Sequence, residues 1–399
     1  MAKEIVKTPL KKGKANFILI GEAKVNDYTF SMDNTYESSS WTDNKLNLGV
    51  DCGNGNTVYA EMSGGYFPNV DSQIYVHGIK EDANGKTEDF ENRFSVDWED
   101  RFDNDILETV ADSCFITVGI TKDDKDKIVY KKFLSGYDAV YYLSKHLENG
   151  MVVCIKGNMA YETDGEHTYI KKKITSITLS KAEPKDYKAT FTQTILLDEH
   201  SVGKEIDKEK NTLNISAYCV DYIGKPKING KKIEVKKNFA IPVNFEYALD
   251  GDKDIVAKQL KTYFKAKKNE VIELTVLGNI VEGATIVNVT LDDIPDDIKE
   301  LIELNYYTEE EALKACAVGN SSREKRMIIV KPTIAINGND KKIPTVAINK
   351  EKYNVNDLEF FNDYLDSLNV DDSDDNYETI EPTSDNDEDD DFMALLNDI

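Results

Sequence analysis

About a third of the way along the chain, the sequence reads Tyr137-Asp-Ala-Val-Tyr-Tyr-Leu-Ser-Lys-His-Leu147, and after Gly150 it continues Met151-Val-Val-Cys-Ile-Lys-Gly-Asn158. The first stretch carries apolar residues at helical spacing and predicts an amphipathic helix. Gly150 is a typical stop after a helix, and the second stretch has the apolar run of a buried strand. Residues 169–179 mix isoleucines with Lys and Thr and predict another strand. The segment therefore predicts a helix, a turn and two strands.

The same order returns later in the chain. Residues 254–264 have helical apolar spacing, and residues 271–279 and 285–291 predict strands. Gly157-Asn158 of the first copy matches Gly278-Asn279 of the second. These matches predict a duplicated supersecondary unit and two related domains. A chance likeness between apolar strands is the alternative.

Each copy follows three strand-like segments, at residues 16–28, 45–52 and 57–62 in the first case and 189–197, 213–222 and 238–249 in the second. Three strands, a helix and two more strands resemble the OB-fold, a five-stranded Greek-key barrel. We therefore expect a mainly β protein with α insertions, in which two tandem OB-fold-like barrels precede a disordered acidic C-terminal tail.

These patterns divide the chain into five parts. We expect a basic N-terminal arm at 1–14, a first OB-like domain at 15–182 with an insertion at about 88–135, a second at 188–293, a helical and mixed segment at 294–369 that packs on it, and a tail at 370–399. The arm holds five lysines and is either a solvated leader or a DNA-contacting tail.

The charge of the chain limits its possible partners. The 399 residues carry a net charge of −25, and residues 370–399 hold 13 Asp and Glu but no Lys or Arg. The rest of the chain is therefore at −12, so any nucleic-acid surface must be a local lysine stripe. With 15 Phe, 21 Tyr and two Trp, the chain has enough large apolar side chains for two or three domains.

Other sequence features concern the membrane, the compartment and metals. No apolar run approaches the length of a bilayer span, and the N-terminus lacks the apolar segment of a secretory signal, so we expect no membrane partner. The five cysteines are scattered and form no CxxC pair. They predict free thiols in a reducing cytoplasm, without a zinc site or a disulfide framework.

The tail combines a charged tether with an apolar end. Residues 371–391 are mostly Asp, Glu, Ser, Asn and Pro, which predicts disorder. One helical face at the end holds Phe392, Leu395, Leu396 and Ile399. The acidic residues Asp389, Asp390 and Asp391 stand where a helix N-terminus favours negative charge. We expect a partner-recognition helix on an acidic tether; a merely solubilising tail is the alternative.

OB-like domains followed by an acidic tail with an apolar end resemble the single-stranded DNA-binding proteins of bacteria and bacteriophages. The resemblance implies barrels that bind single-stranded DNA without sequence choice in replication, recombination and repair. It implies a tail that recruits a phage or host polymerase, helicase, primase or recombinase and competes with DNA for the basic groove. The Lys, Asn, Asp and Tyr bias points to a bacteriophage member acting in the cytoplasm of the infected host. Seven residues follow Asp391-Phe392, unlike the bacterial ending, which leaves the tail's partner open.

Candidate binding residues follow from the chemistry of single strands, whose bases stack on aromatic rings and whose phosphates need cations. In the first domain they are Trp41, Tyr59, Tyr66, Phe67, Tyr75, Tyr161 and Tyr169, with Lys171, Lys172 and Lys173. In the second they are Tyr218, Tyr222, Phe239, Phe245 and Tyr247, with Lys225, Lys227, Lys231, Lys232, Lys236 and Lys237. For any single aromatic, packing in the core is the alternative. Two barrels should cover roughly 8–30 nucleotides, since one OB-fold covers about 4–16.

Two other classes of protein compete with this hypothesis. Four scattered histidines lack metal-ligand spacing, and no Ser or Cys nucleophile motif appears. We therefore expect no catalytic residues, metal or cofactor and no enzyme; a magnesium-dependent nuclease is the enzymatic alternative. A phage structural, scaffolding or interaction protein without nucleic-acid binding is the third possibility.

Overall fold

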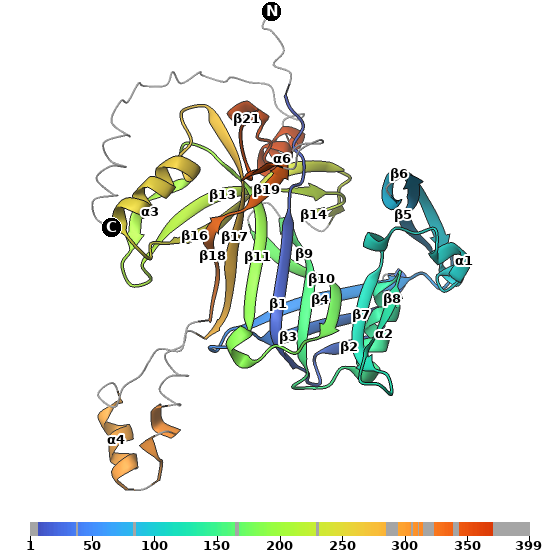
Figure 1. Cartoon of the computed structure of the whole chain (residues 1–399), viewed down its shortest axis with the longest axis horizontal. Coiled ribbons are helices and arrows are strands. Elements are labelled where there is room, and N and C mark those ends of the chain that lie inside the picture. Colours follow the sequence, from blue (N-terminus) through green and yellow to red (C-terminus); the bar gives the residue numbers. More distant parts are fainter. Residues whose placement is uncertain are drawn as a thin grey trace, which may run out of the picture.

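The computed structural model describes residues 7–369 except 37–38, 83–84, 164–166, 229–230, 285–293, 305, 310, 314–322 and 338–342. The described chain is mainly β, and 15 of its strands join in one large mixed sheet (Figure 1). Within this sheet, two sets of five strands have the same pairing pattern.

The first set has a helix between its third and fourth strands. Its elements are β1 (Ala15–Lys24), β3 (Ser39–Asp51), β4 (Thr57–Tyr66), α2 (Gly136–His146), β9 (Val152–Thr163) and β10 (Thr168–Leu179). Antiparallel pairing joins β1 to β3, β3 to β4, β10 to β9 and β9 back to β1. A parallel bridge of Lys173 with Glu61 joins β10 to β4. We name this set the first ring. The helix and two strands predicted for residues 137–179 are confirmed.

The second set repeats this order. Its elements are β11 (Lys188–Leu197), β13 (Thr212–Ile223), β16 (Lys237–Ala248), α3 (Lys253–Gln259), a π-helical turn (Leu260–Phe264), β17 (Glu270–Ala284) and β18 (Arg323–Pro332). Here β11 pairs with β13 and β17, β13 pairs with β16, and β18 pairs antiparallel with β17 and parallel with β16. We name this set the second ring.

The last strand of the second ring differs from the one expected. Residues 285–291, predicted as that strand, lie outside the described residues. The place of the last strand, beside β17 and β16, is taken by β18, which lies much further along the chain. The segment 294–369 therefore supplies a strand to the second ring besides packing on it.

The Gly-Asn match marks equivalent places in the two rings. Phe17 of β1 stands opposite Gly157, and Phe191 of β11 stands opposite Gly278. A Cβ atom on Gly157 would lie 2.0 Å from the carbonyl oxygen of Lys173 and 2.7 Å from the Phe17 ring. A Cβ atom on Gly278 would lie 2.3 Å from the Ile328 oxygen and 2.3 Å from the Phe191 ring. Each glycine is required because a strand and a phenyl ring approach it closely.

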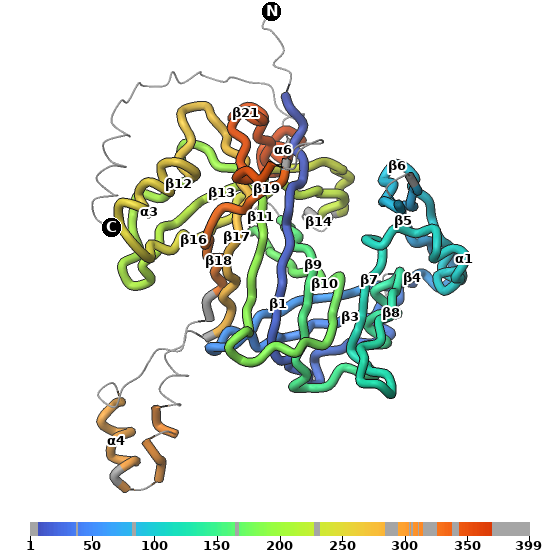
Figure 2. The backbone as a smooth tube through the Cα atoms, in the orientation of Figure 1, coloured from blue at the N-terminus to red at the C-terminus, as the bar shows by residue number. Residues whose placement is uncertain are grey.

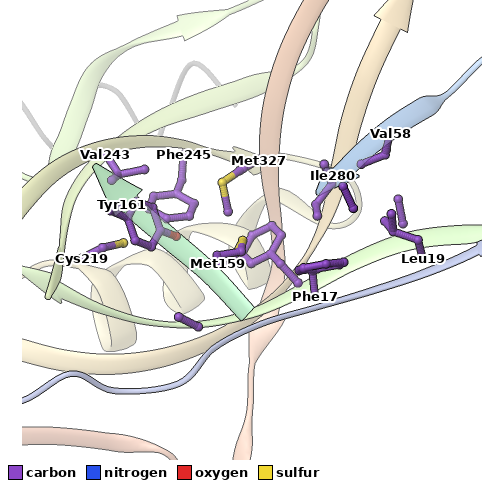
Figure 3. Close-up of a cluster of buried hydrophobic side chains, with 14 of the residues drawn as sticks. Phe17, Leu19, Val58, Met159, Tyr161, Cys219, Val243, Phe245, Ile280 and Met327 are labelled. Carbon is purple, nitrogen blue, oxygen red and sulfur yellow. The ribbon is translucent and has the colours of Figure 1, made fainter. Parts of the chain in front are cut away.

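The two rings share one sheet and one core. β1 runs antiparallel to β11, with Phe17 opposite Phe191. Figure 3 shows side chains of both rings in one buried cluster, including Phe17 and Met159 of the first and Phe245 and Met327 of the second. The two rings are therefore fused into one body and are not separate modules joined by a linker.

A long insertion separates β4 from α2. It holds the hairpin β5 (Gln73–Asp82) and β6 (Gly85–Asp97), the short helices η1 (Trp98–Asp100), α1 (Asn104–Leu107) and η2 (Asp112–Cys114), and the strands β7 (Ile116–Lys122) and β8 (Ile128–Phe133). β5 pairs with β6 in a two-stranded sheet that is separate from the main sheet. This hairpin packs on its own small core, which contains Val76, Val96 and Phe115.

The remaining elements lie outside the two rings. They are β2 (Phe30–Tyr36), η3 (Pro184–Asp186), β12 (Val202–Asp207), β14 (Lys227–Ile228), β15 (Lys231–Lys232), α4 (Asp296–Glu303), β19 (Ile334–Asn337), β20 (Ile343–Val346), β21 (Ile348–Asn354), η6 (Val355–Asp357) and α6 (Phe361–Asn369). The tube in Figure 2 shows α4 apart from both rings. In the described part of the chain, no helix is long and apolar enough to cross a membrane.

The described part of the N-terminal arm lies against the second ring. Leu10 is buried there, and the Thr8 amide donates to Asp357 Oδ1 at 2.6 Å. Lys12 Nζ lies 2.5 Å from Asp221 Oδ1. These contacts hold the described part of the arm against the second ring, although every residue of 7–14 except Leu10 is exposed. Whether its lysines contact DNA stays a prediction.

Candidate nucleic-acid interface

The β3–β4 hairpin has a buried face and an outward face, because successive side chains of a strand alternate. Leu46, Leu48 and Met62 point into the core. Pairing places Asn47 opposite Glu61 and Gly49 opposite Tyr59. The residues between the buried ones therefore form a continuous outward face.

Tyr59 lies on this outward face and covers a glycine of the neighbouring strand. A Cβ atom on Gly49 would lie 3.1 Å from the Tyr59 ring, so the ring rests against β3 where no side chain intervenes. The residue remains 52% exposed. An aromatic ring supported on one face and exposed to solvent has the form of a stacking platform for a nucleic-acid base.

Trp41 has a similar position further along the same hairpin. A Cβ atom on Gly65 would lie 2.7 Å from the Trp41 ring, and the Phe67 ring meets Trp41 edge-on with centroids 4.9 Å apart. The indole Nε1 donates to Asp43 Oδ2 at 3.2 Å. The tryptophan is thus held by a glycine seat, a ring contact and a hydrogen bond.

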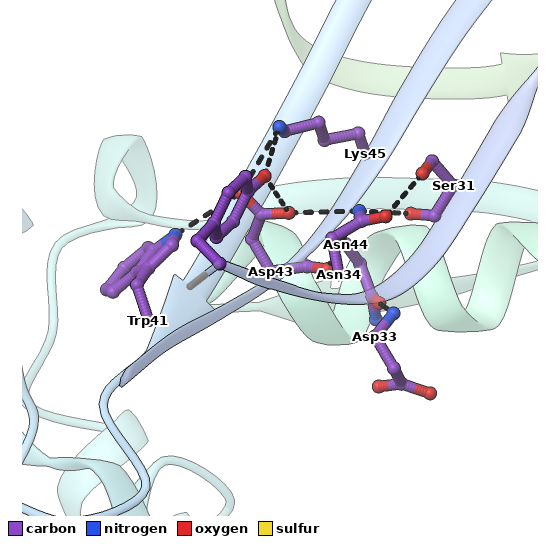
Figure 4. A network of polar contacts seen from close by, with 8 residues as sticks. Ser31, Asp33, Asn34, Trp41, Asp43, Asn44 and Lys45 are labelled. Carbon is purple, nitrogen blue, oxygen red and sulfur yellow. Dashed lines mark hydrogen bonds and ion pairs between the residues drawn. The ribbon is translucent and has the colours of Figure 1, made fainter. Parts of the chain in front are cut away.

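Asp43 centres a polar network beside Trp41 (Figure 4). Burial alone would raise the pKa of the Asp43 carboxyl, but hydrogen bonds from Asn34 and Tyr36 and the charge of Lys45 hold the pKa below its usual value. Lys45 Nζ donates to the Tyr36 hydroxyl at 2.5 Å and lies 3.5 Å from Asp43 Oδ2. The hydrogen bond to Tyr36 raises the pKa of Lys45.

β10 adds cations and a further aromatic to this face. Because Lys173 bridges to Glu61, the alternating residues Tyr169, Lys171 and Lys173 point the same way as Tyr59. Lys171 Nζ lies 2.7 Å and Lys173 Nζ 3.6 Å from carboxylate oxygens of Glu162. A phosphate would therefore compete with a carboxylate for these lysines.

We name the residues Trp41, Lys45, Asn47, Tyr59 and Phe67 the β3–β4 track.

In the described part of the second ring, the position that corresponds to Tyr59 holds no aromatic residue. Because the Glu61–Lys173 bridge corresponds to the bridge of Glu246 with Ile328, the position of Tyr59 is taken by Asn244. Its cross-strand neighbour is Ser216, whose hydroxyl donates to the Asn244 side chain at 3.1 Å. Glu246 is paired with Arg326 Nε at 2.8 Å. The position equivalent to Tyr59 is therefore polar, whereas Tyr218 and Tyr222 lie further along the same face of β13.

The structure brings six of the predicted binding residues onto or beside the track, namely Trp41, Tyr59, Phe67, Tyr169, Lys171 and Lys173. Four others, Tyr161, Lys172, Phe239 and Phe245, are buried and cannot reach a ligand. The phenyl rings and Tyr161 fall on inward-facing positions, and Lys172 Nζ is paired with Glu282 Oε1 at 2.6 Å. Tyr247, also a candidate, is buried as well.

The other predicted residues lie apart or are engaged elsewhere. Tyr66 stacks on Trp98 at 4.7 Å, and the Tyr218 hydroxyl donates to Asp198 at 2.9 Å. Tyr75 and Tyr222 are exposed, on β5 and β13. The lysine-rich segment joins β13 to β16: Lys225, Lys232, Lys236 and Lys237 are exposed, and Lys227 and Lys231 lie in β14 and β15. The tail residues Asp389, Asp390, Asp391, Phe392, Leu395, Leu396 and Ile399 lie outside the described residues.

Sequence reasoning did not identify Lys45, Asn47, Gly49 or Gly65. The signal was present, because the Gly53-Asn-Gly-Asn56 turn fixes the register of the hairpin, and that register places Gly49 opposite Tyr59. A glycine opposite an aromatic residue in a predicted hairpin is therefore the clue to such a platform. Among the residues that the structure describes, no three His, Cys, Asp or Glu side chains gather in a way that could hold a metal ion.

Comparison with known proteins gives few matches. A family model described as YorF matches residues 115–301, from β7 to α4. No curated protein matches the chain. Among solved structures, the chain is similar to a deletion mutant of the single-stranded DNA-binding protein from Thermus aquaticus, with 10% identity, 68% of this chain and 88% of that chain covered, and a TM-score of 0.28. A likeness this distant carries no argument about fold or function.

Proposed function

We propose that the first ring binds single-stranded DNA along the β3–β4 track, without sequence choice and without catalysis. The observation that carries the proposal is the pair of aromatic rings, Tyr59 over Gly49 and Trp41 over Gly65, with Lys45 between them on one face. Every base has a flat face, so such platforms bind any sequence, and each stack contributes about 1–3 kcal/mol.

The strand order of the first ring supports this proposal. Three strands, a helix and two strands whose pairing returns to β1 fit an OB-fold, a Greek-key barrel that is partly open. The single bridge between β10 and β4 is compatible with such an opening. OB-folds bind oligonucleotides on their second and third strands, which here are β3 and β4. The second ring has the same order, and the polar Asn244 and Ser216 at its Tyr59 position favour a supporting role.

The spacing of the platforms sets the scale of the bound strand. The Trp41 ring contacts Phe67, which lies eight residues after Tyr59 on one extended stretch. Eight residues of extended chain span roughly 26 Å. This length holds several unpaired nucleotides. We therefore expect a footprint of about 4–16 nucleotides, that of one OB-fold, rather than the sum of two.

The tail extends this proposal to phage DNA metabolism in the cytoplasm of the infected cell. Residues 370–399 carry 13 acidic side chains and end in apolar residues at helical spacing. Such a segment competes with DNA for lysines and presents a recognition face to a replication, recombination or repair protein. A form ending at Asn369 should accordingly bind oligo-dT more tightly than the full chain, most clearly at low salt. Equal affinities would remove the tail from this role.

A matched pair of tyrosine variants tests the proposed track. Tyr59 and Tyr141 are similarly exposed, at 52% and 54%. Tyr141 also has a lysine nearby, since Lys145 Nζ lies 5.4 Å from its ring, but it belongs to α2 and not to the track. The anisotropy of a labelled oligo-dT of about 30 nucleotides should show that Tyr59→Ala weakens binding about 5- to 150-fold. Tyr141→Ala should bind like the unchanged protein. Equal affinity for both variants, or no binding by the unchanged protein at low salt, would overturn the proposal.

A further inference from the structure

A groove lies at the end of the β3–β4 track, where the insertion meets the hairpin. Its volume is about 540 Å³, within the range of small-ligand sites. Trp41 and Phe67 of the track line one side, and Tyr75 of β5 and Trp98 of η1 contribute from the insertion. Both tryptophans of the chain therefore line this groove.

The aromatic residues of the groove differ in what they can still bind. Trp98 is stacked on Tyr66 at 4.7 Å, and the Arg101 guanidinium carbon lies 4.1 Å from its ring centroid, so both ring faces are covered. Arg101 is itself fixed by Asp138, with Nε 2.8 Å from Oδ2. Trp98 is therefore a fixed wall. Tyr75, in contrast, is 84% exposed and has a ring open to a partner.

The charge of the groove selects one part of a nucleotide. Among the described residues that line it, Asp71 is the charged side chain and there is no Lys or Arg. A phosphate would meet a carboxylate there without a compensating side-chain cation. A neutral, flat base meets aromatic surface instead, together with hydroxyl and backbone groups of Ser63, Ser72 and Ser135.

We propose that this groove receives one unstacked base of the strand bound on the track, held between Trp41 and Tyr75. The inference rests on the proposed function, since Trp41 belongs to both the track and the groove. It adds a specificity element that lies outside the first ring, because the β5–β6 insertion supplies the second wall. A base held in a groove has left its duplex partner, so the site selects unpaired nucleobases over duplex DNA and over the bare sugar–phosphate chain.

Tryptophan emission reports on this groove, because both tryptophans line it, and through Trp41 it also reports on the end of the track. Oligo-dT of about 30 nucleotides should change the emission of the full chain along the same binding curve as the anisotropy of the labelled strand. A duplex of equal length, or a strand of abasic sites, should leave the emission unchanged. An equal change with the abasic strand would mean that the backbone enters the groove, which overturns the inference.

Variants separate this inference from the proposed function. Tyr75→Ala should weaken oligo-dT binding about 5- to 150-fold, the loss of one base stack. Tyr28→Ala, which alters a tyrosine exposed in the turn between β1 and β2, is the matched control and should bind normally. If Tyr59→Ala weakens binding while Tyr75→Ala binds like the unchanged protein, the groove is refuted and the track stands. If Tyr59→Ala has no effect either, the proposed function fails as well.

Discussion

At the scale of single residues, the two rings bury equivalent cysteines. Cys52 and Cys219 occupy corresponding places after the second strand of the first ring and within that of the second. Burial raises the pKa of each thiol to about 12. Cys114 and Cys154 are only half-buried. Since the thiolate is the reactive form, the fold separates its described cysteines into protected and accessible ones.

This separation predicts the order of alkylation. A thiol with a pKa of about 12 carries about a thousandfold less thiolate at pH 8 than one near 9, and burial also blocks the reagent. Iodoacetamide at pH 8, followed by peptide mapping, should modify Cys114 before Cys52 and Cys219, which react only on unfolding. Early modification of Cys219 in the folded protein would contradict its place in the core.

The same shifts fix the sign of a pH dependence. In the unfolded chain these thiols ionise near their usual pKa, whereas in the folded chain they stay protonated up to about pH 12. The unfolded state therefore binds fewer protons in this interval, and stability falls as pH rises above about 8.5. Urea midpoints measured from pH 7 to 10 should decline, and Cys219→Ala should decline less steeply.

At the scale of elements, the glycine of each fourth strand is the clearest structural requirement. An alanine at Gly157 or Gly278 would place its Cβ within 2.0 or 2.3 Å of a carbonyl oxygen and against a buried phenyl ring. We expect Gly157→Ala and Gly278→Ala each to cost at least about 1–3 kcal/mol of unfolding free energy, the usual range for overpacking. Gly224→Ala, where the neighbour is the exposed Tyr222 ring at 3.3 Å, is the control. If Gly278→Ala left the unfolding free energy unchanged while Gly157→Ala lowered it, the two glycines would not be equivalent.

Local sequence patterns predicted the helices and strands well, but they did not predict which distant strands pair. Helical and alternating periods gave α2, β9, β10 and β17, because these depend on neighbours in sequence. The pairing of β18 with β17 and β16 was not predicted, because nothing local indicates that a strand so far along the chain returns to them. Once the register of a strand is known, the alternation of its side chains places Tyr59 on the outward face and Phe245 on the inward face. The burial of Lys172 depends on Glu282 of the other ring and had no local signal.

At the scale of the whole molecule, the rings are joined by a buried ion pair as well as by β1 and β11. Lys172 is 8% and Glu282 11% exposed, and their side chains meet at 2.6 Å. Glu282 Oε2 also accepts the Tyr59 amide at 3.2 Å, and its own amide donates to Asn56 Oδ1 at 2.8 Å. This contact therefore reaches the backbone beneath the proposed track and couples it to the second ring.

Removing one charge of this pair leaves the other buried without a partner, which costs about 3–5 kcal/mol. We expect Lys172→Met and Glu282→Gln each to lower the urea midpoint of the full chain, with one shared transition because the rings have one core. The double variant removes both charges and keeps an acceptor for the Tyr59 amide, so it should be more stable than the sum of the single effects predicts. Lys185→Met, which breaks the exposed pair with Glu183, should leave the midpoint unchanged. Strictly additive single effects, or two separate transitions, would show that the rings are independent bodies and that this pair does not join them.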